Sequence, residues 1–227
     1  MIVISKPVSI AIDGPSGAGK STIAKSLAKE LGFVYIDTGA MYRAVGLYVM
    51  RNGIDPKDES SVVTILDQVD ISITYENGTQ HIFLNGENVS ELIRTPQISM
   101  YASDVSALVP VRLKLVELQR KLAKSRSVIM DGRDIGTYVL PYAQLKIFLT
   151  ASSEERAKRR YEELKAKGEK CSLEQIAADM AKRDENDSKR AFAPLKAADD
   201  AVVLDCTFLN PEQVTKKIIS LLNERNF

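Results

Sequence analysis

The chain has 227 residues, of which 44% are hydrophobic and 27% charged, and its formal net charge is +1. These values fit one globular domain with an insertion, and so small a net charge gives no overall attraction to nucleic acid or to an anionic membrane. No apolar stretch reaches the roughly 18 residues of a spanning helix, and the N-terminus lacks a signal-peptide pattern. The two cysteines, Cys171 and Cys206, have neither metal-like nor disulfide-framework spacing. We therefore expect a cytoplasmic monomer without nucleic-acid or membrane partners.

The first motif is a glycine-rich run that fits Gly-x-x-x-x-Gly-Lys-[Ser/Thr]. An apolar strand pattern at 8–12 precedes the run, and apolar residues at helical spacing follow it as far as Gly32. In this context the backbone N–H groups and the helix N-terminus bind phosphate, whereas a flexible glycine turn is the weaker alternative. We expect Lys20 to reach the β- and γ-phosphates of a nucleoside triphosphate, and Ser21, or alternatively Thr22, to face Mg²⁺. The run comprises Gly14, Pro15, Ser16, Gly17, Ala18, Gly19, Lys20, Ser21 and Thr22.

A second strand pattern at 33–36 ends in Asp37-Thr38-Gly39, where an open α/β sheet places ligand contacts. Residues 40–51 are then predicted to form a helix with Arg43 in its first turn. Because the helix dipole disfavours a cation there, a bound anion explains Arg43 better than an exposed surface arginine does.

The next segment, at about 55–94, departs from the strand–helix alternation. Residues 71–75 alternate strictly between apolar and polar, and a second strand pattern at 81–84 follows the turn signal Asn77-Gly78. The pattern predicts a small antiparallel insertion. His81, the only histidine of the chain, lies on this hairpin, and we assign it no role.

Residues 95–125 are predicted to be largely helical, with a helix that breaks or begins at Pro110. A third strand, at 127–130, ends in Asp131-Gly132-Arg133-Asp134. A carboxylate at the end of a buried strand beside a phosphate loop is well placed to hold Mg²⁺, so Asp131 is the metal candidate.

A fourth strand, at 145–149, precedes two helices that begin with capping-box patterns at Ser152 and Ser172. The helices carry arginines at helical spacing: Arg156, Arg159 and Arg160 on the first, and Arg183 with Asp187 and then Arg190 on the second. This pattern favours a lid that closes on phosphates over the alternative of two salt-bridged exposed helices. A fifth strand, at 201–205, and a helix capped by Asn210-Pro211 complete the chain.

Five apolar strands separated by helices predict a doubly wound parallel sheet of α/β class, and the resemblance described below implies the P-loop kinase type of this sheet. We expect a single domain over 1–227, with an inserted acceptor-binding subdomain at about 38–105 and a helical lid at about 154–192.

A phosphate loop by itself leaves a GTPase, a motor and a kinase open. The chain has no Asn-Lys-x-Asp base motif, which disfavours a GTPase, and it has enough arginines at strand ends and on helices for two phosphate groups. A phosphate monoester acceptor is largely dianionic near neutral pH and needs no general base, only positioning and charge screening.

Three motifs together resemble the bacterial cytidylate kinases: 14–22, the run Tyr35-Ile36-Asp37-Thr38-Gly39-Ala40-Met41-Tyr42-Arg43, and the run from Asp131 to Thr137. The blocks at 146–149, 152–157 and 183–195 extend the resemblance over nearly the whole chain. The resemblance implies transfer of a phosphoryl group from ATP to CMP or dCMP with Mg²⁺, on the nucleoside-monophosphate kinase fold. It places the acceptor phosphate at Arg43 and Arg133, the cytosine at Thr38, Ser103, Arg112 and Asp134, the ribose side and lid at Arg183, Asp187 and Arg190, and charge stabilisation at Arg156 and Arg160.

Three alternatives remain open from the sequence. The acceptor could be another nucleoside monophosphate, UMP or AMP. A small-molecule hydroxyl kinase of the shikimate-kinase type would instead need a carboxylate base, for which Asp37 or Asp134 is available. A nucleotide-binding regulator would bind ATP without transferring phosphate.

Overall fold

The computed structural model describes residues 7–76, 79–166 and 168–225. The predicted Asn77-Gly78 turn lies outside the described residues. Within the described ranges, none of the helices combines the length and the apolar character needed to cross a bilayer.

A parallel sheet of five strands lies at the centre of the fold, in the order β2-β6-β1-β7-β8. The strands are β1 (Ser9–Asp13), β2 (Val34–Asp37), β6 (Val128–Gly132), β7 (Leu145–Thr150) and β8 (Val202–Asp205). The predicted doubly wound parallel sheet is therefore confirmed. The central strands are continuous apolar runs because helices cover both faces of the sheet.

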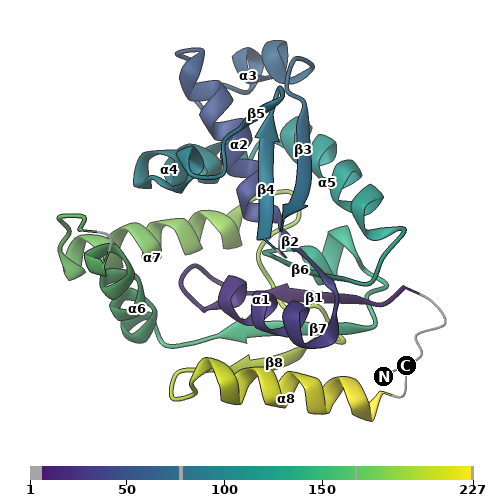
Figure 1. Ribbon diagram of the computed structural model, residues 1–227. Coiled ribbons are helices and arrows are strands. Elements are labelled where there is room, and N and C mark those ends of the chain that lie inside the picture. Colours follow the sequence, from purple (N-terminus) through teal and green to yellow (C-terminus); the bar gives the residue numbers. More distant parts are fainter. Residues whose placement is uncertain (1–6, 77–78, 167, 226–227) are drawn as a thin grey trace.

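Side chains that alternate along β1 enter different cores on the two faces. Ile10 and Ile12 pack with α1 (Lys20–Leu31) and α8 (Pro211–Glu224), whereas Ala11 packs with Val116 of α5 (Val109–Ala123) and with the short helix η2 (Ile135–Val139). Because β1, β2 and β6 are parallel neighbours, their carboxyl ends lie together at one end of the sheet, between the helices that cover its two faces (Figure 1).

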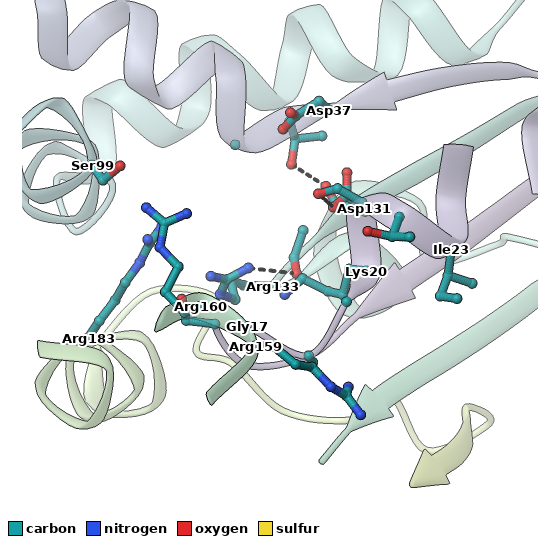
Figure 2. Close-up of a pocket in the computed structure, with 18 of the residues that line it drawn as sticks. Gly17, Lys20, Ile23, Asp37, Ser99, Asp131, Arg133, Arg159, Arg160 and Arg183 are labelled. Carbon is teal, nitrogen blue, oxygen red and sulfur yellow. Dashed lines mark hydrogen bonds between the residues drawn. The ribbon is translucent and has the colours of Figure 1, made fainter. Parts of the chain in front are cut away.

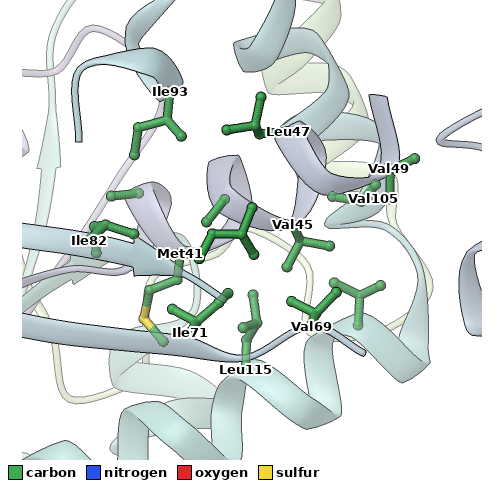
Figure 3. Packing of buried hydrophobic residues seen from close by; sticks show 14 of the residues in the cluster. Met41, Val45, Leu47, Val49, Val69, Ile71, Ile82, Ile93, Val105 and Leu115 are labelled. Carbon is green, nitrogen blue, oxygen red and sulfur yellow. The ribbon is translucent and has the colours of Figure 1, made fainter. Parts of the chain in front are cut away.

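The chain between β2 and β6 forms a separate layer on the β2 side of the sheet (Figure 1). It contains α2 (Thr38–Arg51), α3 (Glu59–Leu66), the antiparallel strands β3 (Ile71–Glu76), β4 (Thr79–Leu84) and β5 (Glu87–Asn88), η1 (Leu92–Arg94) and α4 (Pro96–Val105), followed by α5. This layer has a core of its own, in which Met41, Val45, Ile71, Ile82 and Leu115 meet (Figure 3). The antiparallel hairpin predicted from the alternating pattern is confirmed, because β3 pairs with β4.

Two side chains of the hairpin reach the outer edge of β2. The Tyr75 hydroxyl donates to the Tyr35 carbonyl at 3.0 Å, and the Gln80 carbonyl oxygen accepts from the Asp37 backbone N–H at 2.9 Å. These bonds use backbone groups that an edge strand would otherwise present to solvent. We call the four residues the hairpin contact.

The helix after β2 begins earlier than predicted. The carboxylate of Asp37 accepts from the Ala40 N–H at 2.9 Å, and this N-cap starts α2 at Thr38. Arg43 consequently lies in the second turn, where the helix dipole is weaker, so the dipole argument for a bound anion at Arg43 no longer holds.

The two helices of the predicted lid are α6 (Ser153–Ala166) and α7 (Leu173–Lys189). They pack against each other through a small core, in which Ala157 and Leu164 of α6 meet Ile176 and Met180 of α7. Their capping boxes are only half formed. The Ser152 hydroxyl accepts from the Glu155 N–H at 3.2 Å, but the Ser152 N–H donates to Thr207, and the Glu155 carboxylate pairs with Arg159. At Ser172 the hydroxyl likewise caps the Gln175 N–H, while the Gln175 side chain bonds Asp179. The full capping box is at Asn210 and Gln213, at the start of α8.

Candidate active site

The phosphate loop joins β1 to α1 at the carboxyl edge of the sheet. A side chain at Gly14 would collide with the Leu149 carbonyl, and Gly19 takes a φ of 87° directly before α1, so both positions require glycine. The buried Lys20 ammonium donates to the Pro15 carbonyl at 2.6 Å and thus bends back over the loop. Burial, reinforced by the nearby Arg133, holds the pKa of Lys20 well below its ordinary value.

Oxygen donors suitable for a divalent cation lie beside this loop. The Ser21 hydroxyl donates to one oxygen of Asp131 at 2.7 Å, and the Tyr35 hydroxyl donates to the other at 2.9 Å. Burial, together with the neighbouring Asp37, raises the pKa of Asp131 to about 6. The hydroxyl that reaches Asp131 is that of Ser21, the first of the two candidates in the sequence. No group of three or more His, Cys, Asp or Glu side chains is arranged for a metal in the part of the chain that the structure describes.

Opposite the loop, two buried carboxylates are paired with arginines. Asp134 accepts from Arg112 at 2.5 Å and lies 3.3 Å from Arg190, and Asp187 accepts from Arg133 at 2.8 Å. Burial alone would raise the pKa of Asp187, but the arginines around it hold that pKa below its ordinary value.

Several buried polar atoms on this side have no hydrogen-bond partner within the described residues. They are Ser103 Oγ, Arg112 Nε and Arg183 Nε, together with atoms of Gln119 and Thr137, whereas Arg190 Nη2 has only the 3.3 Å ion pair with Asp134. Burial, with Arg133 nearby, lowers the pKa of Arg183 to about 10. Unpaired buried donors of this kind are costly unless a ligand or water satisfies them, so the arrangement favours an anionic, hydrogen-bonding ligand.

A single cavity of about 840 Å³ connects the phosphate loop with these arginines. Figure 2 shows Arg160 and Arg183 on one side of it and Asp131 on the other, with Arg133 and Lys20 between them. Most of the predicted site residues line this cavity: Ser16, Gly17, Ala18, Gly19, Lys20, Ser21, Thr22, Thr38, Arg43, Arg112, Asp131, Arg133, Asp134, Arg160, Arg183, Asp187 and Arg190.

Four predicted residues are not part of the cavity wall: Gly14, Pro15, Ser103 and Arg156. Gly14 and Pro15 shape the base of the phosphate loop, and α4 with the following residue contributes Ser99, Ala102 and Ser106 to the wall instead of Ser103. The Arg156 guanidinium is engaged by the carbonyls of Ala151 and Ser16 and by the carboxylate of Asp184.

The structure also brings to the site residues with no predicted contact to substrate or cofactor. Tyr42 stacks on the Arg112 guanidinium, 5.5 Å from ring centre to Cζ, and Arg94 lies 3.9 Å from Asp37. Arg159 donates to the carbonyls of Cys206 and Thr207, in the loop between β8 and α8 that also borders the cavity. Arg159 lies three residues after Arg156, and that helical spacing predicts it as part of the lid, whereas nothing in the sequence marks Arg94.

A phosphate loop at the carboxyl edge of a doubly wound parallel sheet, facing an arginine-lined cavity, defines a P-loop kinase. Among solved structures, an uncharacterised protein from Eubacterium ventriosum is similar with a TM-score of 0.54 and 13% identity, over 95% of this chain and 98% of that chain. A sugar kinase from Janibacter is similar with a TM-score of 0.50 and 13% identity, over 96% and 95% of the two chains. At such identities these structures support the fold alone.

The family model "Cytidylate kinase" matches residues 10–224. The cytidylate kinase of Caldicellulosiruptor bescii is 57% identical over 216 residues, 95% of this chain and 96% of the relative. That of Carboxydothermus hydrogenoformans is 50% identical over 217 residues, 96% and 98% of the two chains. The chain belongs to the cytidylate kinase family, as its three sequence motifs predict.

Proposed function

We propose that this chain transfers the γ-phosphoryl group of ATP to CMP or dCMP, giving ADP and CDP or dCDP, with Mg²⁺. The observation that carries the proposal is the continuous cavity, which has a phosphate loop at one end and unpartnered buried arginine nitrogens beside a carboxylate at the other. Such a cavity suits two nucleotides that meet through their phosphates. The chain's membership of the cytidylate kinase family supports cytosine as the acceptor base. We further propose that it works as a cytoplasmic monomer.

In the donor half, the backbone of residues 14–22 would surround the phosphates of ATP, with the Lys20 ammonium directed at the β- and γ-phosphates. The Ser21 hydroxyl and the Asp131 carboxylate are hard oxygen donors on one side of the cavity, so they fit Mg²⁺ as ligands, directly or through water. When bound, the ion would neutralise phosphate charge.

In the acceptor half, Arg43 and Arg133 would hold the acceptor phosphate, and Arg183, Asp187 and Arg190 would hold the ribose side. Thr38, Ser103, Arg112 and Asp134 would surround the base. A carboxylate accepts a hydrogen bond from the exocyclic N4 amino group of cytosine, whereas uracil has a carbonyl acceptor at that position. Because Arg112 and Arg190 flank Asp134, its carboxylate is fixed for this contact.

The catalytic task for these residues is orientation and charge screening. His81 lies on the hairpin, 3.8 Å from Glu76, and is not part of the cavity wall. A dianionic acceptor phosphate can attack without a general base. Lys20, Arg133 and Arg160 would stabilise the charge on the transferred group.

The decisive experiment is a coupled assay of ADP release with CMP, dCMP, UMP, AMP and GMP as acceptors. We expect the highest kcat/KM with CMP or dCMP. Highest turnover with AMP would contradict the proposal, and a pH–rate limb belonging to a carboxylate base would favour a hydroxyl acceptor. ATP binding with no turnover on any acceptor would indicate a regulator.

A further inference from the structure

The tip of the phosphate loop is held by two side chains from the helices α6 and α7. The Ser16 N–H donates to the Asp184 carboxylate at 2.9 Å, and the Ser16 carbonyl accepts from the Arg156 guanidinium at 2.8 Å. Arg156 and Asp184 are themselves paired at 2.5 Å. One residue of the loop is thus bound at both its N–H and its C=O by an ion pair, and we call Ser16, Arg156 and Asp184 the loop clasp.

The loop clasp is largely shielded from water and is supported by packing. The side chains of Arg156 and Asp184 are 11% and 18% exposed, which strengthens charge-assisted hydrogen bonds. The Met180 methyl group of α7 lies 2.5 Å from the point where a Cβ on Gly17 would stand. Figure 1 shows α6 and α7 beside the loop that precedes α1. Since a glycine-rich loop has little stiffness of its own, these contacts help to determine its shape.

The helix that supplies Asp184 also reaches the acceptor side of the cavity. Arg183 is the adjacent residue on α7, and Asp187, three residues further along, accepts from Arg133. Both line the cavity. A helix moves as a rigid element, so a shift of α7 toward an acceptor nucleotide would also move the carboxylate that holds the Ser16 N–H.

We propose that Arg156 and Asp184 are positioning residues that couple the two nucleotide sites, because engagement of α7 by the acceptor nucleotide sets the shape of the phosphate loop that receives ATP. The proposal rests on the proposed function. Neither side chain lines the cavity, so neither is placed to touch the reacting atoms. For Arg156 this role replaces direct contact with the transferred phosphoryl group, because its guanidinium is committed to Ser16, Ala151 and Asp184.

The test is isothermal titration calorimetry with CMP and with the magnesium complex of adenylyl imidodiphosphate, each alone and in the presence of the other. The variants are Asp184→Asn, Arg156→Met and the double variant. Asp184→Asn keeps an oxygen for the Ser16 N–H but removes the charge that pairs with Arg156. The matched control is Glu185→Gln, which removes a carboxylate from the exposed pair with Lys189 on the same helix.

In the wild-type chain we expect each nucleotide to tighten the binding of the other. Each single variant should bind the ATP analogue about 10-fold more weakly, as expected for a lost charge-assisted contact, and should lose this mutual tightening. The affinity for CMP alone should not change. The double variant should be no weaker than the weaker single variant, because the pair is already broken by either change. Glu185→Gln should match the wild type.

Additive losses in the double variant, or retained mutual tightening in both single variants, would overturn the proposal. Thermal unfolding of each variant shows whether it folds. If Arg156→Met does not fold, Arg156→Lys replaces it; lysine keeps the charge without the planar fork, so this variant should also lose the mutual tightening of the two nucleotides. The proposed function fails separately, if the wild-type chain turns over no pyrimidine monophosphate. The effect of Asp184→Asn on analogue binding still tests the loop clasp in that case.

Discussion

At the scale of single residues, the site contains more charge than the chain as a whole suggests. The net charge of the chain is +1, yet Arg133, Arg183 and Arg190 surround Asp187, and all three line one cavity. The buried carboxylates keep these guanidinium groups together by offsetting their mutual repulsion. An anionic ligand would complete that neutralisation and so reduce the energetic cost of the site further.

Replacing Arg133 by alanine should lower kcat in the CMP assay by roughly 10²-fold or more, since it removes a charged donor from the site of transfer. Binding of an ATP analogue should be retained. Arg51→Ala is the matched control, because Arg51 forms an ion pair with Glu87 and is 40% exposed. Wild-type turnover in the Arg133 variant would exclude the assigned role.

Asp13 makes a pH-dependent contribution to the free energy of unfolding, and comparison with Asp13→Asn separates this contribution from those of other groups. Its carboxylate accepts from the N–H groups of Ile135 and Gly136, and burial raises its pKa to about 7. The folded state therefore binds this proton more tightly than the unfolded state, so the contribution is present below about pH 4 and is lost as the pH rises to about 7.

The upper limit of this loss is about 4 kcal/mol, a value that already includes the opposing effect of the two backbone donors. Urea unfolding of the wild type and of Asp13→Asn at pH 5 and pH 8 measures it. The stability advantage of the wild type should be larger at pH 5, because the variant does not titrate there. A difference independent of pH would contradict the raised pKa.

At the scale of secondary structure, the sequence predicts the long elements well because their signals are local. The five strands are apolar runs, and the helices at 20–31 and 211–224 have a glycine stop or an asparagine cap. Two short elements, β5 and η2, lack such signals, and the eight-residue α3 has only its Asp58 cap. These elements are stabilised by packing, because isolated segments of this length would not be stable.

The residues of the candidate site also differ in how far the sequence predicts them. Residues at the ends of strands, such as Asp131 and Arg133, follow from the sequence, because parallel strands align their carboxyl ends. The direction of a lid side chain does not follow from helical spacing. Arg156 and Arg160 share a face, yet Arg156 binds the phosphate loop and Arg160 lines the cavity. Tertiary contacts therefore decide whether an arginine on this helical face binds the loop or lines the cavity.

The close approach of α2 and α4 gives a prediction at this scale. A Cβ added to Gly46 would lie 2.9 Å from the Ala102 nitrogen and 3.1 Å from the Tyr101 Cβ. Gly46→Ala should therefore destabilise the chain by about 1–3 kcal/mol through overpacking, and it should raise KM for CMP, because α4 borders the cavity. Urea unfolding and acceptor kinetics measure the two effects. A gain of up to about 1 kcal/mol, as at an open helical glycine, would show that no such contact exists.

At the scale of the whole molecule, the hairpin contact joins the inserted layer to the central sheet. Tyr75→Phe removes the donor to the Tyr35 carbonyl and should cost about 1 kcal/mol of unfolding free energy. Because Asp37 of the same contact caps α2, which lines the acceptor half, KM for CMP should rise several-fold while KM for ATP stays unchanged. Steady-state kinetics with each substrate varied in turn test this. Equal changes in both KM values would point to general destabilisation.

The order of the sheet has a consequence for how such a protein can diversify. The chain leaves the sheet at the end of β2 and returns in β6, and these two strands are neighbours. The whole inserted layer therefore begins at the carboxyl end of β2 and ends at the amino end of the neighbouring β6, while the phosphate loop lies between β1 and α1, outside the insertion. A change in the length or the content of that layer leaves the strand order and the ATP-binding loop untouched. Acceptor contacts within that layer, such as Arg43 and Arg112, can thus change through one contiguous piece of the gene, whereas Asp134 lies outside it, after β6.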